Sequence, residues 1–270
     1  MKILLDNIDL NEALSGVSNL GFVPTMGSLH KGHISWIKKS LKVSNKTIVS
    51  IFVNPKQFNN KQDYKRYPRN NKKDLSILKR LKVDFVFLPK KEHIFLTQNK
   101  YKPKLRKKEK ILCAKYRKGH FEGVIDVMEH LTKMINPSKI FMGEKDFQQY
   151  ILVKKYIKKK FKTKIILCKT IRDHNKLALS SRNLLLNKKE FKSASEIAQN
   201  LITYKKKLNK NDNLKEIIFK KEKELKQKFN ISVDYLELRN KINLKIDNTT
   251  KNTKLFIAYH LNKIRLIDNF

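Results

Sequence analysis

Hydrophobic and polar residues along the first two thirds of the chain alternate between short apolar runs and stretches with helical spacing. The apolar runs predict five strands, at about residues 20–23, 47–53, 83–88, 139–142 and 165–168. Between them, helical spacing predicts helices at about 8–15, 34–44, 72–81 and 119–135, and a further helix after 143. The run T-I-V-S-I-F-V at 47–53 is almost wholly apolar, which is typical of a parallel strand buried on both faces. The pattern therefore predicts an α/β fold with a parallel sheet.

The last third of the chain has a different order of elements. Helical patterns at 188–208 and 213–229 come before apolar runs at 231–238, 254–260 and 263–268. Helices followed by strands predict a small separate α+β domain. We place the boundary so that the first domain is 1–175 and the second is 176–270.

One strand-to-helix turn, P-T-M-G-S-L-H-K-G-H at residues 24–33, has the features of an anion site. Free N–H groups and the positive dipole end of the helix attract phosphate, and Gly27 and Gly32 allow backbone to approach it. His30 and His33, three residues apart, can donate to phosphate oxygens. The turn indicates binding of a nucleotide's phosphates, and the alternative is a capped turn with two solvated histidines.

Three later segments place polar groups near strand ends or in a loop. N-P-K-Q-F follows the strand at 47–53 and contains Asn54 and Gln57, amides suited to hydroxyls and carboxylates. G-E-K-D-F-Q-Q at 143–149 adds Lys145 to a second strand-glycine-helix turn. L-A-L-S-S-R-N at 177–183 adds hydroxyls and one arginine suited to pyrophosphate. Each segment also has a purely structural alternative. N-P-K-Q-F matches a surface turn, Lys145 a surface charge, and S-S-R a helix cap.

Composition changes the picture mainly through charge. The chain has 62 Lys and Arg against 24 Asp and Glu, a net charge of +38. Such an excess is compatible with a nucleic-acid partner, but the lysines are dispersed along the chain. Asn and Ile are also abundant, as codons rich in A and T would produce. We interpret the charge as a reflection of genome composition, with no specific nucleic-acid partner.

Cysteine content and hydropathy exclude other classes. Cys113 and Cys168 have no C-x-x-C spacing, which argues against a disulfide framework or a zinc ribbon. They are expected to be small buried residues. No apolar run is long enough to cross a bilayer, and the first ten residues meet acids too early for a secretion signal. We therefore expect no membrane partner and a cytoplasmic location.

Together, these segments resemble the pantothenate synthetases, the pantoate–β-alanine ligase family of the H-x-G-H nucleotidyl-transferase superfamily. The matching pieces are P-T-M-G-S-L-H-K-G-H, V-S-I-F-V-N-P-K-Q-F with R-Y-P-R, G-H-F-E-G-V with G-E-K-D-F-Q-Q, and L-A-L-S-S-R-N. The resemblance implies a Rossmann-like catalytic domain, a C-terminal lid domain and a homodimer. It also implies a reaction in which ATP and pantoate, with Mg²⁺, give pantoyl adenylate and pyrophosphate. The amine of β-alanine then attacks the adenylate, releasing pantothenate and AMP.

The resemblance also assigns roles to individual residues. His33, in the position of the family's proton donor, His30, Lys145 and Arg182 would be catalytic. The implied ATP-binding residues are Met26, Gly27, Ser28, Leu29, His30, Lys31, Gly32, His33, Gly143, Glu144, Lys145, Asp146, Ile171, Leu179, Ser180, Ser181 and Arg182. The implied residues around pantoate and β-alanine are Gln57, Gln149, Asn54, Tyr67, Arg117 and His120.

The chain departs from the family pattern in its loops. Lys118 and Lys176 stand where the family has proline and glycine, and Asn59-Asn60 replace a glycine after Q-F. These departures affect loop geometry more than the reaction. The acidic pair of some relatives is here Lys73-Asp74, which leaves the protein ligands of Mg²⁺ unassigned.

Two alternatives remain at this point. One is another H-x-G-H adenylyltransferase, acting on a substrate such as nicotinate mononucleotide or phosphopantetheine. The paired glutamines and the C-terminal domain argue against it. The other is a basic RNA-binding protein, against which the dispersed lysines and the missing aromatic-basic motifs count.

Overall fold

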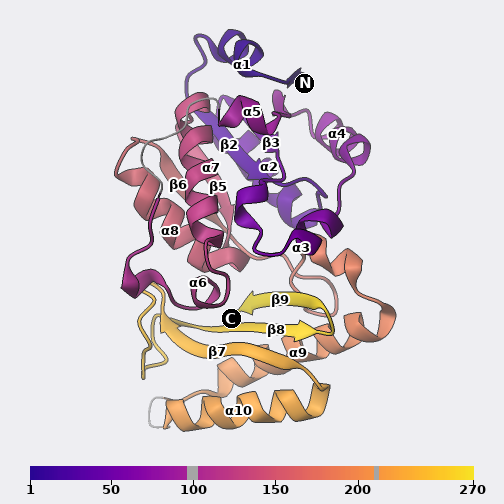
Figure 1. The fold of residues 1–270 in the computed structure, drawn as a ribbon, viewed down its shortest axis with the longest axis vertical. Coiled ribbons are helices and arrows are strands. Elements are labelled where there is room, and N and C mark those ends of the chain that lie inside the picture. Colours follow the sequence, from indigo (N-terminus) through magenta and orange to yellow (C-terminus); the bar gives the residue numbers. More distant parts are fainter. Residues whose placement is uncertain (96–102, 210–212) are drawn as a thin grey trace. The chain divides into compact units, whose positions relative to one another are not determined.

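The chain folds into two compact units, Met1–Lys169 and Thr170–Phe270. A computed structural model describes residues 1–95, 103–209 and 213–270 (Figure 1). In these ranges no helix combines the length and the apolar character needed to span a bilayer. Cys113 and Cys168 are both buried thiols that form no disulfide with each other, as predicted from the sequence.

The first unit is built on a six-stranded sheet in which every pair of neighbours is parallel. Its order is β1-β4-β3-β2-β5-β6. The strands are β1 Lys2–Leu4, β2 Leu20–Thr25, β3 Lys46–Ile51, β4 Phe85–Phe87, β5 Lys139–Gly143 and β6 Lys164–Cys168. The five predicted strands are all present. The sixth, β1, has only three residues and was missed because so short a run has no measurable period.

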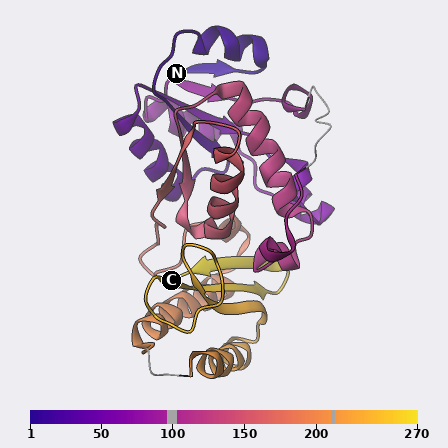
Figure 2. The same cartoon turned by 90° about the vertical axis from the view of Figure 1, so that its left-hand side faces the viewer.

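Helices cover the sheet on both faces (Figures 1 and 2). They are α1 Asn7–Leu14, α2 Lys31–Val43, α3 Lys61–Arg66, α4 Asn71–Arg80, α5 Lys91–Ile94, α6 Cys113–Tyr116, α7 His120–Ile135 and α8 Phe147–Lys158, with short 3₁₀ turns η1 Pro55–Gln57, η2 Lys107–Glu109 and η3 Glu144–Asp146. Val23 and Val49 pack in one cluster with residues of α2 and α4. Their neighbours Phe22 and Ile48 point to the opposite face and are also fully buried.

Strand order places the candidate turns together. β2 lies between β3 and β5. After β2 the chain adds β3 and β4 on one side of it, and later adds β5 and β6 on the other side. Ligands of open α/β sheets bind beyond the carboxyl ends of strands at such a switch point. The turns after β2, β3 and β5 contain the predicted residues 26–33, 54–57 and 143–146.

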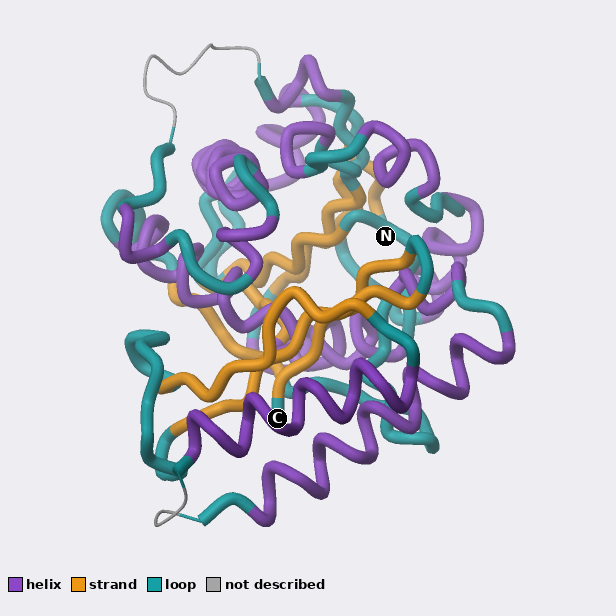
Figure 3. The backbone as a smooth tube through the Cα atoms, turned by 60° about the horizontal axis from the view of Figure 1, so that its bottom comes forward, coloured by secondary structure: helices purple, strands orange, loops and turns teal. Residues whose placement is uncertain are grey.

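The second unit combines two helices with a separate antiparallel sheet, which confirms the predicted α+β domain. Its elements are η4 Ser181–Leu185, α9 Lys188–Lys207, α10 Leu214–Phe229, β7 Ser232–Asn240, β8 Thr253–Leu261 and β9 Ile264–Asn269. The strands pair in the order β7-β8-β9. Figure 3 shows the long helices beside the strands. Leu201, Leu225 and Leu255 are fully buried in the core between them.

Candidate active site

The turn after β2 is fixed by a carboxylate from α4. Gly27 has φ +78°, and a Cβ there would lie 2.9 Å from Asp74 Oδ2, so the turn needs glycine. Asp74 is 1% exposed and accepts hydrogen bonds from Ser28 N (2.7 Å) and Leu29 N (2.8 Å). Gly27 N donates to the Thr25 hydroxyl. Asp74 therefore positions the turn, a role that its sequence neighbourhood did not indicate.

The two histidines begin α2 by capping it. His30 is the N-cap residue, and its Nδ1 accepts from Gly32 N at 3.1 Å. His33 Nδ1 in turn accepts from His30 N at 3.4 Å. Because Nδ1 accepts in each ring, the proton of each neutral imidazole lies on Nε2. The ring centroids are 4.1 Å apart.

This capping corrects one expectation from the sequence. The N–H groups of the turn were expected to be free for phosphate, but those of Gly27, Ser28, Leu29, His30 and Gly32 donate to groups of the protein. These backbone donors are therefore occupied, and the Nε2–H of each histidine is the ring donor that takes no part in the cap.

Both histidines are neutral at physiological pH. Burial lowers the pKa of His30 to about 4, with a further lowering by Lys145 and a smaller opposing effect of Asp146. Burial, His30 and Lys145 hold the pKa of His33 well below its usual value. The fixed positive charge in this part of the site therefore belongs to Lys145.

The turn after β5 packs against α2 through Trp36. A Cβ on Gly143 would lie 2.1 Å from the Trp36 ring, so this glycine makes room for the indole. Trp36 meets the His33 ring edge-on, with centroids 5.0 Å apart. Glu144, Lys145 and Asp146 follow in η3 and are half-buried.

Amide and imidazole groups meet at η1, beside the turn after β2. Gln57 Nε2 lies 2.7 Å from Met26 Sδ, and Asn54 Nδ2 donates to Gln57 Oε1 at 3.4 Å. His120 Nδ1 donates to Gln57 O at 2.6 Å, while its Nε2 accepts from Arg117 Nη1 at 2.9 Å. The structure thus brings residues predicted from three separate segments into one network.

The remaining predicted substrate residues are Tyr67 and Gln149. Tyr67 is buried and packs edge-on against Phe58. Gln149 on α8 is half-buried. Its neighbour Gln148 is buried and donates to Ile111 O at 2.7 Å, which fixes the segment before α6. Of these two glutamines, Gln149 is the less buried.

The predicted ATP residues Ile171 and 179–182 belong to the second unit. Leu179 N donates to Ile171 O, and Arg172 pairs with Ala178, so residues 171–179 form a small hairpin. Ser180 caps η4, with Oγ accepting from Arg182 N at 3.3 Å. Ser181 is buried and Arg182 is half-buried.

The structure shows the surroundings or the backbone conformation of each loop departure. Asn59 Nδ2 donates to Lys118 O, so two of the departures contact each other. Asn60 caps α3 by accepting from Gln62 N at 2.7 Å. Lys176 has φ +70°, a backbone region that favours the glycine of the family pattern.

Comparisons with known proteins show which family and which solved structures the whole chain is similar to. Residues 5–270 match the family described as pantoate-beta-alanine ligase. A pantothenate synthetase of Francisella tularensis subsp. mediasiatica is 39% identical over 275 residues, covering 99% of this chain and 97% of the relative. The solved pantothenate synthetase of Thermus thermophilus has a TM-score of 0.91 at 28% identity, covering 100% of this chain and 99% of its own. The pantoate-beta-alanine ligase of Francisella tularensis, solved with beta-gamma ATP and beta-alanine, has a TM-score of 0.85 at 35% identity, with 100% and 97% covered.

Proposed function

The chain belongs to the pantoate–β-alanine ligase family, and on this premise we propose which of its residues carry out the reaction. Enzymes of this family condense pantoate with β-alanine by consuming ATP, through a pantoyl adenylate. Another H-x-G-H adenylyltransferase is not favoured, because the family match extends over residues 5–270.

The first step is attack of the pantoate carboxylate on the α-phosphorus of ATP. Lys145 and the Nε2–H groups of His30 and His33 would stabilise the charge that develops on the phosphates. The lowered pKa of both histidines favours donation of a hydrogen bond over release of a proton from an imidazolium. Lys145 would supply the positive charge, and the phosphate contacts of 179–182 remain a prediction.

The second step is attack of the β-alanine amine on the adenylate carbonyl. Gln57, with Gln149, would bind pantoate, while Asn54, Tyr67, Arg117 and His120 would surround β-alanine. The observation that best supports this assignment is the 2.7 Å contact between Gln57 Nε2 and Met26 Sδ. It links the amide network directly to the turn proposed to bind ATP.

Mg²⁺ would be bound mainly by the triphosphate. Among the described residues, no group of three or more His, Cys, Asp and Glu side chains could hold a metal ion. Both oxygens of Asp74 already accept backbone N–H groups, whereas Asp146 lies close enough to influence His30. These residues fit an ion that keeps phosphate and water ligands and reduces the negative charge on ATP. The homodimer remains a prediction from the family, and the cytoplasmic location remains a prediction from the sequence.

Product release from ATP tests the function. Purified protein with ATP and Mg²⁺ should release pyrophosphate when pantoate is added, and should turn over with AMP release only when β-alanine is also present. Failure of pantoate to elicit pyrophosphate from folded protein would contradict the assignment.

Lys145→Ala should lower the rate of adenylate formation about 10²–10³-fold, the typical cost of losing one contact to transition-state charge. Lys162→Ala, an exposed lysine after α8, is the matched control and should keep the normal rate. Near-normal adenylate formation by Lys145→Ala would remove Lys145 from the site.

A further inference from the structure

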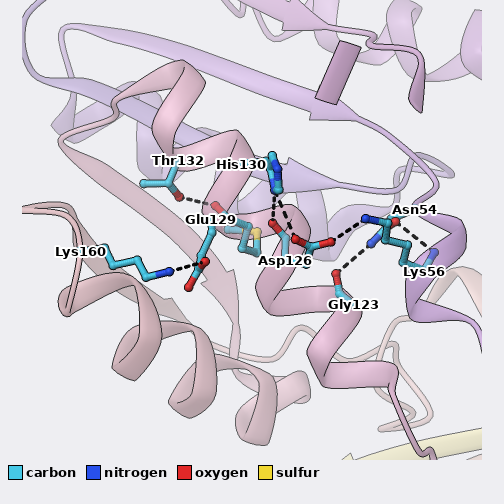
Figure 4. Close-up of polar contacts among 9 residues, drawn as sticks. Asn54, Lys56, Gly123, Asp126, Glu129, His130, Thr132 and Lys160 are labelled. Atoms are coloured by element: carbon cyan, nitrogen blue, oxygen red, sulfur yellow. Dashed lines mark hydrogen bonds and ion pairs between the residues drawn. The ribbon is translucent and has the colours of Figure 1, made fainter. Parts of the chain in front are cut away.

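One side of α7 faces the η1 turn. His120 donates to Gln57 O, and Gly123 O accepts from Asn54 Nδ2 at 3.0 Å. A Cβ on Gly123 would lie 2.2 Å from Lys56 O, so helix and turn are in direct backbone contact. One turn further along α7, Asp126 Oδ2 accepts from Lys56 Nζ at 2.8 Å (Figure 4). Contacts from positions 120, 123 and 126 therefore all reach the same three-residue turn.

Two aromatic rings, of Phe95 and His130, lie beside the Lys56–Asp126 ion pair. Lys56 Nζ lies 3.6 Å from the centroid of Phe95, and His130 meets Phe95 edge-on. His130 Nδ1 donates to Asp126 O at 2.8 Å and lies 3.4 Å from Asp126 Oδ1. The Asp126 side chain is only 14% exposed. These neighbours fix the position of the carboxylate that receives Lys56.

The same lysine is tied to the amide network. Lys56 N donates to Asn54 Oδ1 at 3.1 Å, and Asn54 Nδ2 donates to Gln57 Oε1. Fixing Lys56 at both its backbone and its ammonium group therefore restricts the turn that presents Gln57.

A second ion pair on α7 provides a comparison. Glu129 Oε2 accepts from Lys160 Nζ at 2.7 Å, beyond the end of α8 and apart from η1 (Figure 4). The lysine side chains of the two pairs are equally exposed, 43% for Lys56 and 44% for Lys160. The two pairs thus differ in the elements that they join: Lys56 joins η1 to α7, whereas Lys160 joins the residues after α8 to α7.

We propose that Lys56 and Asp126 are positioning residues that fix η1 and hold the Gln57 side chain in place for pantoate. The inference rests on the proposed function of Gln57. It predicts that loss of the ion pair weakens use of pantoate while binding of ATP is retained.

The test compares Lys56→Met with Lys160→Met in the full chain. Lys56→Met should raise the KM for pantoate about fivefold, the size expected for a partly exposed ion pair acting through position. The Kd for ATP should change less than about twofold. Lys160→Met, which leaves the buried Glu129 unpaired, should lose at least as much thermal stability with no change in the pantoate KM. Equal KM increases in both variants would indicate general loosening and overturn the proposal.

Rescue and coupling complete the test. Lys56→Arg keeps the charge and should restore the normal KM. Asp126→Asn should raise KM as Lys56→Met does, and the double variant should be no worse than either. Gln57→Ala distinguishes failure of the proposed pantoate-binding role of Gln57 from failure of the positioning role of Lys56. If Gln57→Ala raises the pantoate KM and Lys56→Met does not, the positioning role fails alone. If Gln57→Ala has no effect, the proposed role of Gln57 fails and the inference fails with it.

Discussion

His30 has a structural role at one ring nitrogen and a proposed chemical role at the other. Its Nδ1 accepts from Gly32 N and caps α2, which leaves the proton of the neutral ring on Nε2, the nitrogen that we propose donates to phosphate. Capping requires an acceptor at Nδ1, so it also determines which nitrogen has the proton. Burial and the nearby Lys145 then keep the ring neutral.

A His30→Asn variant should separate these roles. Asparagine is a preferred N-cap residue, and its Oδ1 can replace Nδ1 as the acceptor. We expect unchanged stability at pH 7, but adenylate formation lowered about 10²–10³-fold because the Nε2–H donor is lost. An active variant would show that His30 is a cap alone.

The same variant should change how stability depends on pH. The pKa of His30 is lowered from 6.5 to about 4 in the folded protein. Below pH 6.5 the unfolded chain therefore binds a proton more readily than the folded chain, and stability falls as pH falls. Between pH 6.5 and 5 this group should cost the wild-type protein about 2 kcal/mol of unfolding free energy. Urea unfolding at both pH values should show that the unfolding free energy of His30→Asn falls less than that of wild type, by this amount. If the unfolding free energies of both proteins fall equally with pH, the lowered pKa of His30 is contradicted.

Lys176 is a residue placed in a conformation that suits glycine. Its φ of +70° should strain the folded protein by about 1–2 kcal/mol, and glycine would remove this strain. Glycine also has more conformational freedom in the unfolded chain, which costs about 0.5–1 kcal/mol of the gain. Lys176→Gly should therefore raise the unfolding free energy by about 0.5–1 kcal/mol, measured by urea unfolding. Lys188→Gly, at the first position of α9, is the comparison and should give no gain. A destabilised Lys176→Gly would show that the lysine side chain contributes more than the strain costs.

At the scale of elements, contact between α7 and η1 depends on Gly123. The carbonyl of Lys56 would lie 2.2 Å from a Cβ at this position, and Asn54 donates to Gly123 O. A helix normally gains from replacing glycine with alanine, so the glycine indicates that close approach is more important here than helix propensity.

Gly123→Ala should separate the helix from the turn. We expect a loss of about 1–3 kcal/mol of unfolding free energy, since both backbones must shift. Lys133→Ala, exposed on the same helix, should change stability by less than about 0.5 kcal/mol. Urea unfolding of both variants measures the difference, and a Gly123→Ala protein as stable as wild type would mean that η1 moves freely.

At the scale of the whole molecule, glycine scarcity has affected how the chain turns. The chain has seven glycines in 270 residues. In the described ranges, ten non-glycine residues have positive φ, and five of them are asparagines, including those that end α7 and α10. Asparagine is the residue that best tolerates this region after glycine, so it limits the strain. This use of asparagine agrees with our interpretation that codon composition shaped the chain.

The same scale shows what the sequence could predict. Strands such as β3 and β5 were predicted because a buried parallel strand requires an uninterrupted apolar run. The short strand β1 and the helix α3 were not predicted. The residues of the turn after β2 were singled out from the sequence as candidates for ATP binding. That their N–H groups bond to the protein was not predicted, because Asp74 lies 45 residues away in sequence from Leu29. The packing of Gly143 against Trp36 was missed for the same reason. Contacts between distant segments depend on the folded sheet, and a local pattern does not contain them.

Net charge gives the last prediction. A protein with a charge of +38 binds any polyanion at low salt, because each phosphate that it neutralises releases a counterion. If the charge reflects composition alone, poly(U), poly(A) and a structured RNA should bind equally, with affinity falling about 10³-fold between 50 and 200 mM KCl. Filter binding over this range measures both the slope and the selectivity. A complex with one RNA that persists at 200 mM KCl while the homopolymers dissociate would require contacts to bases, and would give the lysines a function of their own.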